Sequence, residues 1–338
     1  MVTKIGLDLG YANITVSDTI AGIYREQSVA LIDKDSRRII SVGNAAIEQA
    51  EELSDSALLV RPFKNGLLFD RQITQSIVSH VVGSIPESER LRCVIGIPSD
   101  LIAKQEKDIF NILGDAGIEE CYAVNRAVAA LIGAGGNPAQ SVISVNVGAS
   151  ATEIAVLHNG QVTYTARELI GGEDFDKAVK QYIGEQGGVN VSISVARAIK
   201  EQLGSVWQGK EESSVEIEGT LSLTGNSVKM TISSEDIVGV FEKPLHRLLM
   251  AVAVAIKKIP LDQVEHIFKN GIVLTGGGAM IHGLDLMMSK VLGVPVRQPV
   301  DPIDSVAKGL SIINARLPVR GKSSRKNVTA QLANYYKD

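Results

Sequence analysis

The sequence is poor in aromatic residues, cysteines and long apolar stretches, and the last two shortages each exclude a class of protein. Aromatic residues make up 4% of the 338 residues. Only two cysteines occur, which excludes a disulfide framework and a cysteine-rich metal site. No run approaches the roughly 18 apolar residues that cross a bilayer. Cys93 and Cys121 stand in apolar segments, so we expect both to be inert structural thiols.

The charge of the chain is mildly negative and unevenly distributed. A net charge of −4 argues against nucleic acid as the main partner. From Arg316 to Asp338 the chain carries six Lys and Arg against one Asp, so the remainder carries about −9. The opening residues "MVTKIGLDLG" lack the charged and apolar regions of a signal peptide, and a cytoplasmic location is therefore expected.

What the chain does contain is an internal repeat. The stretches "IGLDLGYANITVS" and "VISVNVGASATEIAVL" both indicate a strand, a turn of small residues and a second strand. They match at an offset of 138 residues, which aligns Asp8 with Asn146 and Gly10 with Gly148. Strands alternate with helices after each copy. This pattern predicts an α/β protein of two similar lobes with a ligand cleft between them.

The domain boundaries follow from where the repeat starts and where polar insertions interrupt it. We expect a first-lobe core of residues 1–31, 66–141 and 307–317 with a small insert at 32–65, a second-lobe core of residues 142–183 and 242–306 with an insert at 184–241, and a basic, flexible tail at 318–338. Asp100 or Ser99 is expected to cap the helix that follows Pro98. Pro244 is expected either within the first turns of a long helix or at a break in it.

Glycine-containing turns in both copies suit phosphate binding. A tight turn of small residues exposes successive backbone N–H groups as an anion cradle, and two such turns can clamp a polyphosphate. An acidic residue before each turn could hold the water shell of Mg²⁺. The run Gly276 to Gly278 ends an apolar strand and allows the backbone to pass close to a nucleotide base. Each feature alone also fits an ordinary turn, but their combination favours a nucleotide site.

These motifs resemble the bacterial actins of the MreB and MamK kind, within the actin, Hsp70 and sugar-kinase superfamily. The resemblance covers nearly the whole chain to about Leu317, and its most specific stretch is "LTGGGAMIHGLDLMMSKVLGVPVRQPVDPIDSVAKG". It implies an actin-like fold with a duplicated RNase H-like core, ATP or ADP with Mg²⁺ as cofactors, and longitudinal self-association into a cytoskeletal filament for cell shape or intracellular organisation.

The resemblance also implies which residues bind the nucleotide. Asp8 would face the metal through water. The residues at the phosphates would be Gly10, Tyr11, Ala12, Asn13, Gly148, Ala149, Ser150 and Ala151. The residues at the nucleoside would be Gly171, Gly172, Lys200, Glu201, Gly276, Gly277 and Gly278. Lys200 and Glu201 also fit one turn of a solvated helix.

Three positions depart from the family pattern. The second loop of the family typically carries Asp where this chain has Asn146, so magnesium is expected to bind more weakly. The family's helix after the first-lobe strand usually begins with two glutamates, the second of which positions the attacking water. Asn125 and Arg126 stand there instead, and an arginine cannot act as a base. Weak or absent ATP hydrolysis is therefore expected, with the alternative that another carboxylate takes over.

Three functions remain open on the sequence alone. A filament subunit is the first hypothesis, because neither a sugar-binding insert nor a peptide-binding domain is visible. The alternative is a non-polymerising actin-like scaffold or adaptor of the division or assembly type. A metabolite kinase is the least favoured, since no catalytic Asp beside a sugar pocket is apparent. Membrane-associated morphogenesis proteins are candidate partners, and the tail 318–338 is a candidate for lipid contact.

Overall fold

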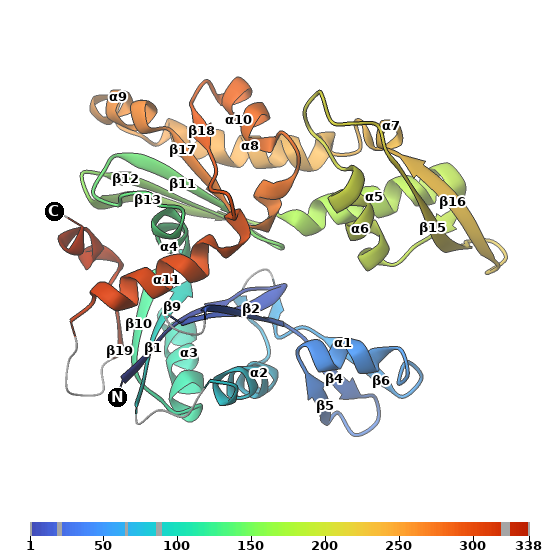
Figure 1. Cartoon of the computed structure of the whole chain (residues 1–338), viewed down its shortest axis with the longest axis horizontal. Coiled ribbons are helices and arrows are strands. Elements are labelled where there is room, and N and C mark those ends of the chain that lie inside the picture. The colour runs from blue at the N-terminus through green and yellow to red at the C-terminus, as the bar shows by residue number, and fades with distance from the viewer. Residues whose placement is uncertain (1, 19–21, 65–66, 86–89, 319–324, 337–338) are drawn as a thin grey trace.

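A computed structural model describes residues 2–18, 22–64, 67–85, 90–318 and 325–336, and it shows two lobes built on mixed sheets (Figure 1). The first-lobe sheet has the order β19-β10-β9-β1-β2-β3. Its strands are β1 (Val2–Leu9), β2 (Asn13–Asp18), β3 (Gly22–Gln27), β9 (Arg90–Ile97), β10 (Ile118–Asn125) and β19 (Arg325–Asn327).

The second lobe repeats this plan with the order β13-β12-β11-β17-β18. Its strands are β11 (Val142–Val147), β12 (Thr152–His158), β13 (Gln161–Glu168), β17 (Ile272–Thr275) and β18 (Val296–Arg297). Asp8 pairs with Thr15 across the β1–β2 hairpin, and Asn146 pairs with Glu153 across the β11–β12 hairpin. Asp8 and Asn146 are 138 residues apart, and so are Thr15 and Glu153. The predicted duplication and α/β fold are therefore confirmed.

Each sheet is covered on its outer face by helices. In the first lobe these are α2 (Arg71–Gly83) and α3 (Ala103–Asp115); in the second they are α8 (Glu242–Lys257), α9 (Leu261–Asn270) and α10 (Leu284–Leu292). Strand alternation explains the layering, because Ile5 and Leu7 of β1 point into the outer core while Gly6 faces Leu310 on the inner side. None of the helices among the described residues is long and apolar enough to cross a bilayer.

Two helices lie between the sheets and join the lobes (Figure 1). Helix α4 (Arg126–Gly133) follows β10 of the first lobe but packs on β11 and β12 of the second. Helix α11 (Ser305–Arg316) follows the second-lobe strands but packs on β1, β2 and β9. An added Cβ at Gly133 would lie 1.8 Å from the Ser305 carbonyl oxygen, and one at Gly309 would lie 1.8 Å from the Ala129 carbonyl oxygen. The two helices therefore cross in backbone contact.

Both lobes carry small inserts, which lie on the same side of the molecule, at the right in Figure 1. The first contains β4 (Ala30–Asp33), β5 (Ile39–Val42), α1 (Asn44–Ala50) and β6 (Ala57–Val60), and the chain returns through β7 (Phe63–Lys64) and β8 (Leu67–Leu68). The second contains β14 (Val189–Asn190), α6 (Ile193–Leu203), β15 (Ser214–Leu221), β16 (Ser227–Ser233) and α7 (Ser234–Ile237), and it is joined to the lobe core by α5 (Gly172–Gly187).

The C-terminal tail differs from the expectation of a flexible segment. Strand β19 pairs in parallel with β10, and Val328 and Leu332 are buried in the core between the lobes. The Thr329 hydroxyl accepts a hydrogen bond from the backbone N–H of Asn125. A flexible tail is therefore the wrong description of residues 325–336. The remaining basic part of the candidate lipid-contacting segment, residues 319–324, lies outside the described residues, as do 337–338.

The structure also decides where two helices begin. The cap predicted for the helix after Pro98 is wrong, and the place of Pro244, which the sequence left open, is now known. Helix α3 begins at Ala103 behind Ile102, so neither Ser99 nor Asp100 caps it. Asp100 instead accepts a hydrogen bond from Arg167 Nε of β13 over 2.6 Å, a long-range ion pair that competes with local capping. The long helix around Pro244 is broken: α7 ends at Ile237, and Pro244 lies in the first turn of α8, where a missing N–H costs nothing.

We predict that Gly133→Ala and Gly309→Ala each lower the melting temperature, because the new methyl group would overlap a carbonyl oxygen of the facing helix. Overpacking of this kind costs about 1–3 kcal/mol. Gly83→Ala, at the end of α2, is the matched control, since among the described residues its Cβ would meet nothing within 4 Å. Thermal unfolding followed by circular dichroism measures the difference. Three equal melting temperatures would contradict the backbone contact between α4 and α11.

Candidate functional site

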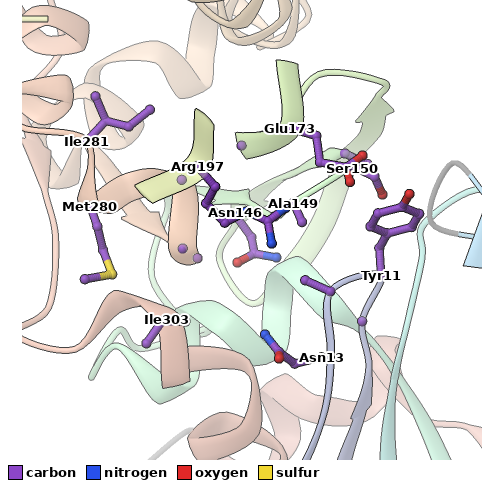
Figure 2. A pocket seen from close by; sticks show the side chains of 18 of the residues that line it. Tyr11, Asn13, Asn146, Ala149, Ser150, Glu173, Arg197, Met280, Ile281 and Ile303 are labelled. Atoms are coloured by element: carbon purple, nitrogen blue, oxygen red, sulfur yellow. The ribbon is translucent and has the colours of Figure 1, made fainter. Parts of the chain in front are cut away.

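A cavity of about 500 Å³ lies between the lobes and is lined by both glycine hairpins. Tyr11 and Asn13 of the first lobe reach into it toward Asn146, Ala149 and Ser150 of the second (Figure 2). Of the residues singled out in the sequence, those lining the cavity are Asp8, Gly10, Tyr11, Ala12, Asn13, Arg126, Asn146, Gly148, Ala149, Ser150, Ala151, Gly172, Lys200, Glu201, Gly276, Gly277 and Gly278.

The first loop, between β1 and β2, is held tightly by its own backbone and by Arg61. A Cβ at Gly10 would lie 2.6 Å from the Asn13 carbonyl oxygen, which explains the glycine. Arg61 Nη1 donates to the carbonyl oxygens of Tyr11 (3.1 Å) and Ala12 (3.2 Å), and its guanidinium lies 5.3 Å from the centre of the Tyr11 ring. Arg61 lies at the end of the first insert, and its role was not predicted from the sequence.

The second loop, between β11 and β12, is closed by the start of α5. The N–H of Gly148 donates to the Ala151 carbonyl over 2.9 Å, and the N–H of Gly172 donates to the Gly148 carbonyl over 2.9 Å. A Cβ at Gly171 would lie 2.6 Å from the Ala149 carbonyl oxygen. Gly171 therefore packs behind the loop instead of lining the cavity, and its role is to allow α5 to approach.

The three glycines after β17 have different roles. Gly276 has a left-handed backbone (φ 86°), and its Cβ would lie 2.4 Å from the Val147 carbonyl oxygen. Gly278 is equally constrained, since its Cβ would lie 2.3 Å from Val147 Cγ1. A Cβ at Gly277 would meet only Ile303 among the described residues, at 3.8 Å. Two glycines thus serve the packing against β11, and Gly277 keeps the cavity wall open.

The cavity also contains an ion cluster on α5 and α6, centred on the buried Asp176. Asp176 is fully buried and lies 2.6 Å from Lys200 Nζ and 3.0 Å from Arg197 Nε. The Lys200 side chain is 11% exposed, so its interpretation as part of a solvated helix face is wrong. Glu201 is exposed, although it lines the cavity. Met280, Ile281 and Ile303 form an apolar wall nearby (Figure 2).

Tyr11 and Glu173 approach each other across the cleft (Figure 2). Tyr11 belongs to the first-lobe loop, and Glu173 lies in the first turn of α5 in the second lobe. Burial raises the pKa of Tyr11, and the charge and hydrogen bond of Glu173 raise it further. The phenol is therefore kept protonated as a donor, and the contact is a polar link between the lobes that the sequence did not reveal.

The base of the cleft is occupied by the guanidinium of Arg126. Its Nε donates to Asp8 Oδ1 and its Nη1 to Glu153 Oε1, both over 2.8 Å. The Arg126 side chain is only 11% exposed. Burial alone would lower the pKa of Arg126, but the charges of Asp8 and Glu153 raise it above its ordinary value, so the guanidinium stays protonated. Asp8, the residue expected to face a metal, is thus engaged by Arg126.

Glu153 is a second carboxylate at the base of the cleft, and its role was not predicted from the sequence. It stands where the first lobe has Thr15, so the acid of the second lobe lies on β12 and the neutral Asn146 on β11. Burial raises the pKa of Glu153, although Arg126 acts in the opposite direction. Its Oε2 is buried without a hydrogen-bond partner in the described structure. The offset of 138 residues was the signal that could have found it.

Asn125 does not line the cavity. Its side-chain oxygen accepts a hydrogen bond from the N–H of Val128 over 3.1 Å, which makes it the N-cap of α4. The cap satisfies one of the unpaired donors at the start of the helix and so holds the neighbouring Arg126 in place. Of the three positions that depart from the expected acidic pattern, Asn125 is therefore structural, whereas Arg126 and Asn146 belong to the cavity.

Two similar lobes joined by crossed helices around this cleft define an actin-like protein. The sequence matches the family model described as MreB/Mbl protein over residues 2–319, and the chain belongs to that family. It is 28% identical over 316 residues to the cell shape-determining protein MreB of Escherichia coli (strain K12), covering 90% of this chain and 91% of that protein. Its identity to the cell shape-determining protein Mbl of Bacillus cereus is 27% over 326 residues, covering 94% and 98%.

Solved structures agree with the fold. The structure of MreB5 of Spiroplasma citri bound to AMPPNP superposes with a TM-score of 0.87 at 23% identity, covering 93% of this chain and 96% of that one. The MamK double helical filament superposes with a TM-score of 0.80 at 20% identity, covering 94% and 100%. The resemblance to bacterial actins and the actin-like fold expected from the sequence are confirmed.

We predict that Arg126→Gln lowers the free energy of unfolding by about 3–5 kcal/mol, because it leaves two largely buried carboxylates without their common partner. Adding Glu153→Gln should recover part of the loss by removing one of these charges. Arg247→Gln is the control, because its pair with Asp174 is exposed and such pairs contribute up to about 1 kcal/mol. Chemical denaturation measures all three. Equal stability of Arg126→Gln and the wild type would contradict the network.

Proposed function

We propose that this chain is a nucleotide-binding subunit of a cytoskeletal filament, with weak or absent ATP hydrolysis. The observation that supports it best is the combination of retained glycine hairpins with an arginine between the carboxylates of the cleft. The glycine hairpins that suit phosphate binding are retained, whereas Arg126 stands at the base of the cleft between Asp8 and Glu153. The curated relatives are cell shape-determining proteins, which supports a role in cell shape or intracellular organisation.

Nucleotide binding is supported by the backbone of the cleft and by its relatives. Glycine clearance and backbone N–H groups make up most of a phosphate cradle, and they depend little on the replaced side chains. The structures of MreB5 of Spiroplasma citri contain AMPPNP in one case and ADP in another. A cavity of about 500 Å³ lies in the size range of small-molecule sites. We therefore propose ATP and ADP as the ligands.

Weak hydrolysis is expected because the carboxylates at the base of the cleft are hydrogen-bonded to Arg126. Attack on a phosphate needs a water that a base or acceptor orients. Glu153 is a candidate replacement at the base of the cleft, but one of its oxygens accepts from Arg126 and the other is buried. Arg126 itself cannot accept a proton. Losing a general base commonly costs on the order of 10²–10⁴ in rate.

Self-association is supported by the match to a filament structure. The MamK chain that superposes with a TM-score of 0.80 was solved as a double helical filament.

We predict that the protein pellets on ultracentrifugation with ATP or ADP while phosphate release stays at the level of the buffer control. Fast phosphate release would contradict the proposed loss of hydrolysis. A monomer at every protein and nucleotide concentration would favour the scaffold or adaptor function instead.

We further predict that the double variant Arg126→Glu with Asn146→Asp raises phosphate release, because it restores an acceptor for water and a charge beside the second loop. Asn146→Asp alone is the matched control: it adds the charge but leaves Arg126 in place, so no gain is expected. Phosphate release per bound nucleotide is the measured quantity, which separates turnover from affinity. If the single variant gained as much as the double variant, Arg126 would not be the cause of slow turnover.

A further inference from the structure

The carboxylates at the base of the cleft do not fit a magnesium ion. Mg²⁺ usually binds through one or two free carboxylates, phosphate oxygens and several waters. Here Asp8 accepts from Arg126 Nε, Glu153 accepts from Arg126 Nη1, and Asn146 is neutral. Within the described ranges, no three His, Cys, Asp or Glu side chains are grouped so that they could hold a metal ion. Asp8, which the sequence predicts to hold magnesium through water, thus already accepts a hydrogen bond from a cation of the chain.

The guanidinium of Arg126 is fixed from several directions. Besides the two carboxylates, its Nη2 donates to the carbonyl oxygen of Leu9 over 3.1 Å and lies 3.5 Å from that of Gly96. These contacts account for four of its five N–H groups. The remaining N–H, on Nη1, has no acceptor in the described part of the chain, and Arg126 lines the cavity. One charged donor is thus left for an oxygen of the ligand.

The position of this cation is central. Asp8 lies on β1 of the first lobe, directly before the first glycine loop. Glu153 lies on β12 of the second lobe, directly after the second glycine loop. The guanidinium is paired with both acids, so the three ionised side chains carry a net charge of −1 instead of the −2 of the two acids alone. Its positive charge thereby reduces the repulsion of phosphates held by both loops. A divalent ion supplies that charge in many phosphate sites and leaves with the nucleotide. Arg126 supplies a single charge that is part of the chain.

We propose that Arg126 acts as a built-in counter-ion for the nucleotide phosphates, so that this cleft binds nucleoside di- and triphosphates without Mg²⁺. This inference rests on the proposed nucleotide binding and specifies its metal requirement. It draws on the charge-assisted hydrogen bond that a guanidinium forms with a phosphate oxygen, which is stronger than a neutral one. Magnesium would have to compete with Arg126 for Asp8 and Glu153, so its addition contributes little.

Calorimetric titration of the full chain with ADP and with AMPPNP, in EDTA and in excess MgCl₂, tests the inference without any variant. The expected result is binding in both buffers with dissociation constants within about threefold of each other. Binding that weakens by more than about tenfold in EDTA would overturn the inference and leave the proposed nucleotide binding intact. Absence of binding in both buffers would overturn both.

Arg126→Gln tests the residue itself. It removes the charge and releases Asp8 and Glu153, so affinity in EDTA should fall about 10- to 100-fold, as for loss of a charged hydrogen bond, and Mg²⁺ should restore part of it. Arg25→Gln is the matched control, because Arg25 lines the same cavity but pairs with Asp304. Its affinity should change equally in both buffers. An Arg126→Gln protein as indifferent to Mg²⁺ as the wild type would contradict the role of Arg126.

Discussion

The backbone contact between α4 and α11 is the constraint on which the rest of the structure depends. Gly133 and Gly309 allow the two helices to cross so closely that each added methyl group would overlap a carbonyl oxygen. Each helix packs on the sheet of the lobe that it enters, so the crossing determines how the two sheets face each other. Arg126 begins α4, and the same contact therefore sets the position of its side chain in the cleft.

The charges at the base of the cleft depend on one another. The first lobe has Asp8 opposite Thr15, whereas the second has Asn146 opposite Glu153, so each hairpin contributes one acid. Arg126 neutralises across both. Burying such ions is costly unless every member has a partner. Arg126 therefore cannot be considered apart from Asp8 and Glu153, because loss of any one of the three leaves a largely buried ion without its partner.

The sequence predicted what depends on local pattern and on repetition. The offset of 138 residues, the glycine turns and the strand alternation placed both hairpins correctly, because a period of two and a tight turn are visible within a few residues. It missed what depends on distant partners. Strand β19 is three residues long and polar, so only its pairing with β10 reveals it. The ion pairs of Arg126 and the support of the first loop by Arg61 join segments far apart in the chain.

The proposed nucleotide binding and the proposed loss of hydrolysis involve different parts of this cleft. The phosphate loops are shaped by glycines whose neighbours are backbone atoms, such as Gly10 against Asn13 and Gly148 against Ala151, so side-chain replacement elsewhere leaves them unchanged. Hydrolysis requires side-chain carboxylates free to orient water, and Arg126 engages Asp8 and Glu153 at the base of the cleft. A single residue at the start of one helix can therefore withdraw the groups for chemistry and still leave the cradle. Its positive charge also offsets part of the negative charge of Asp8 and Glu153 beside that cradle.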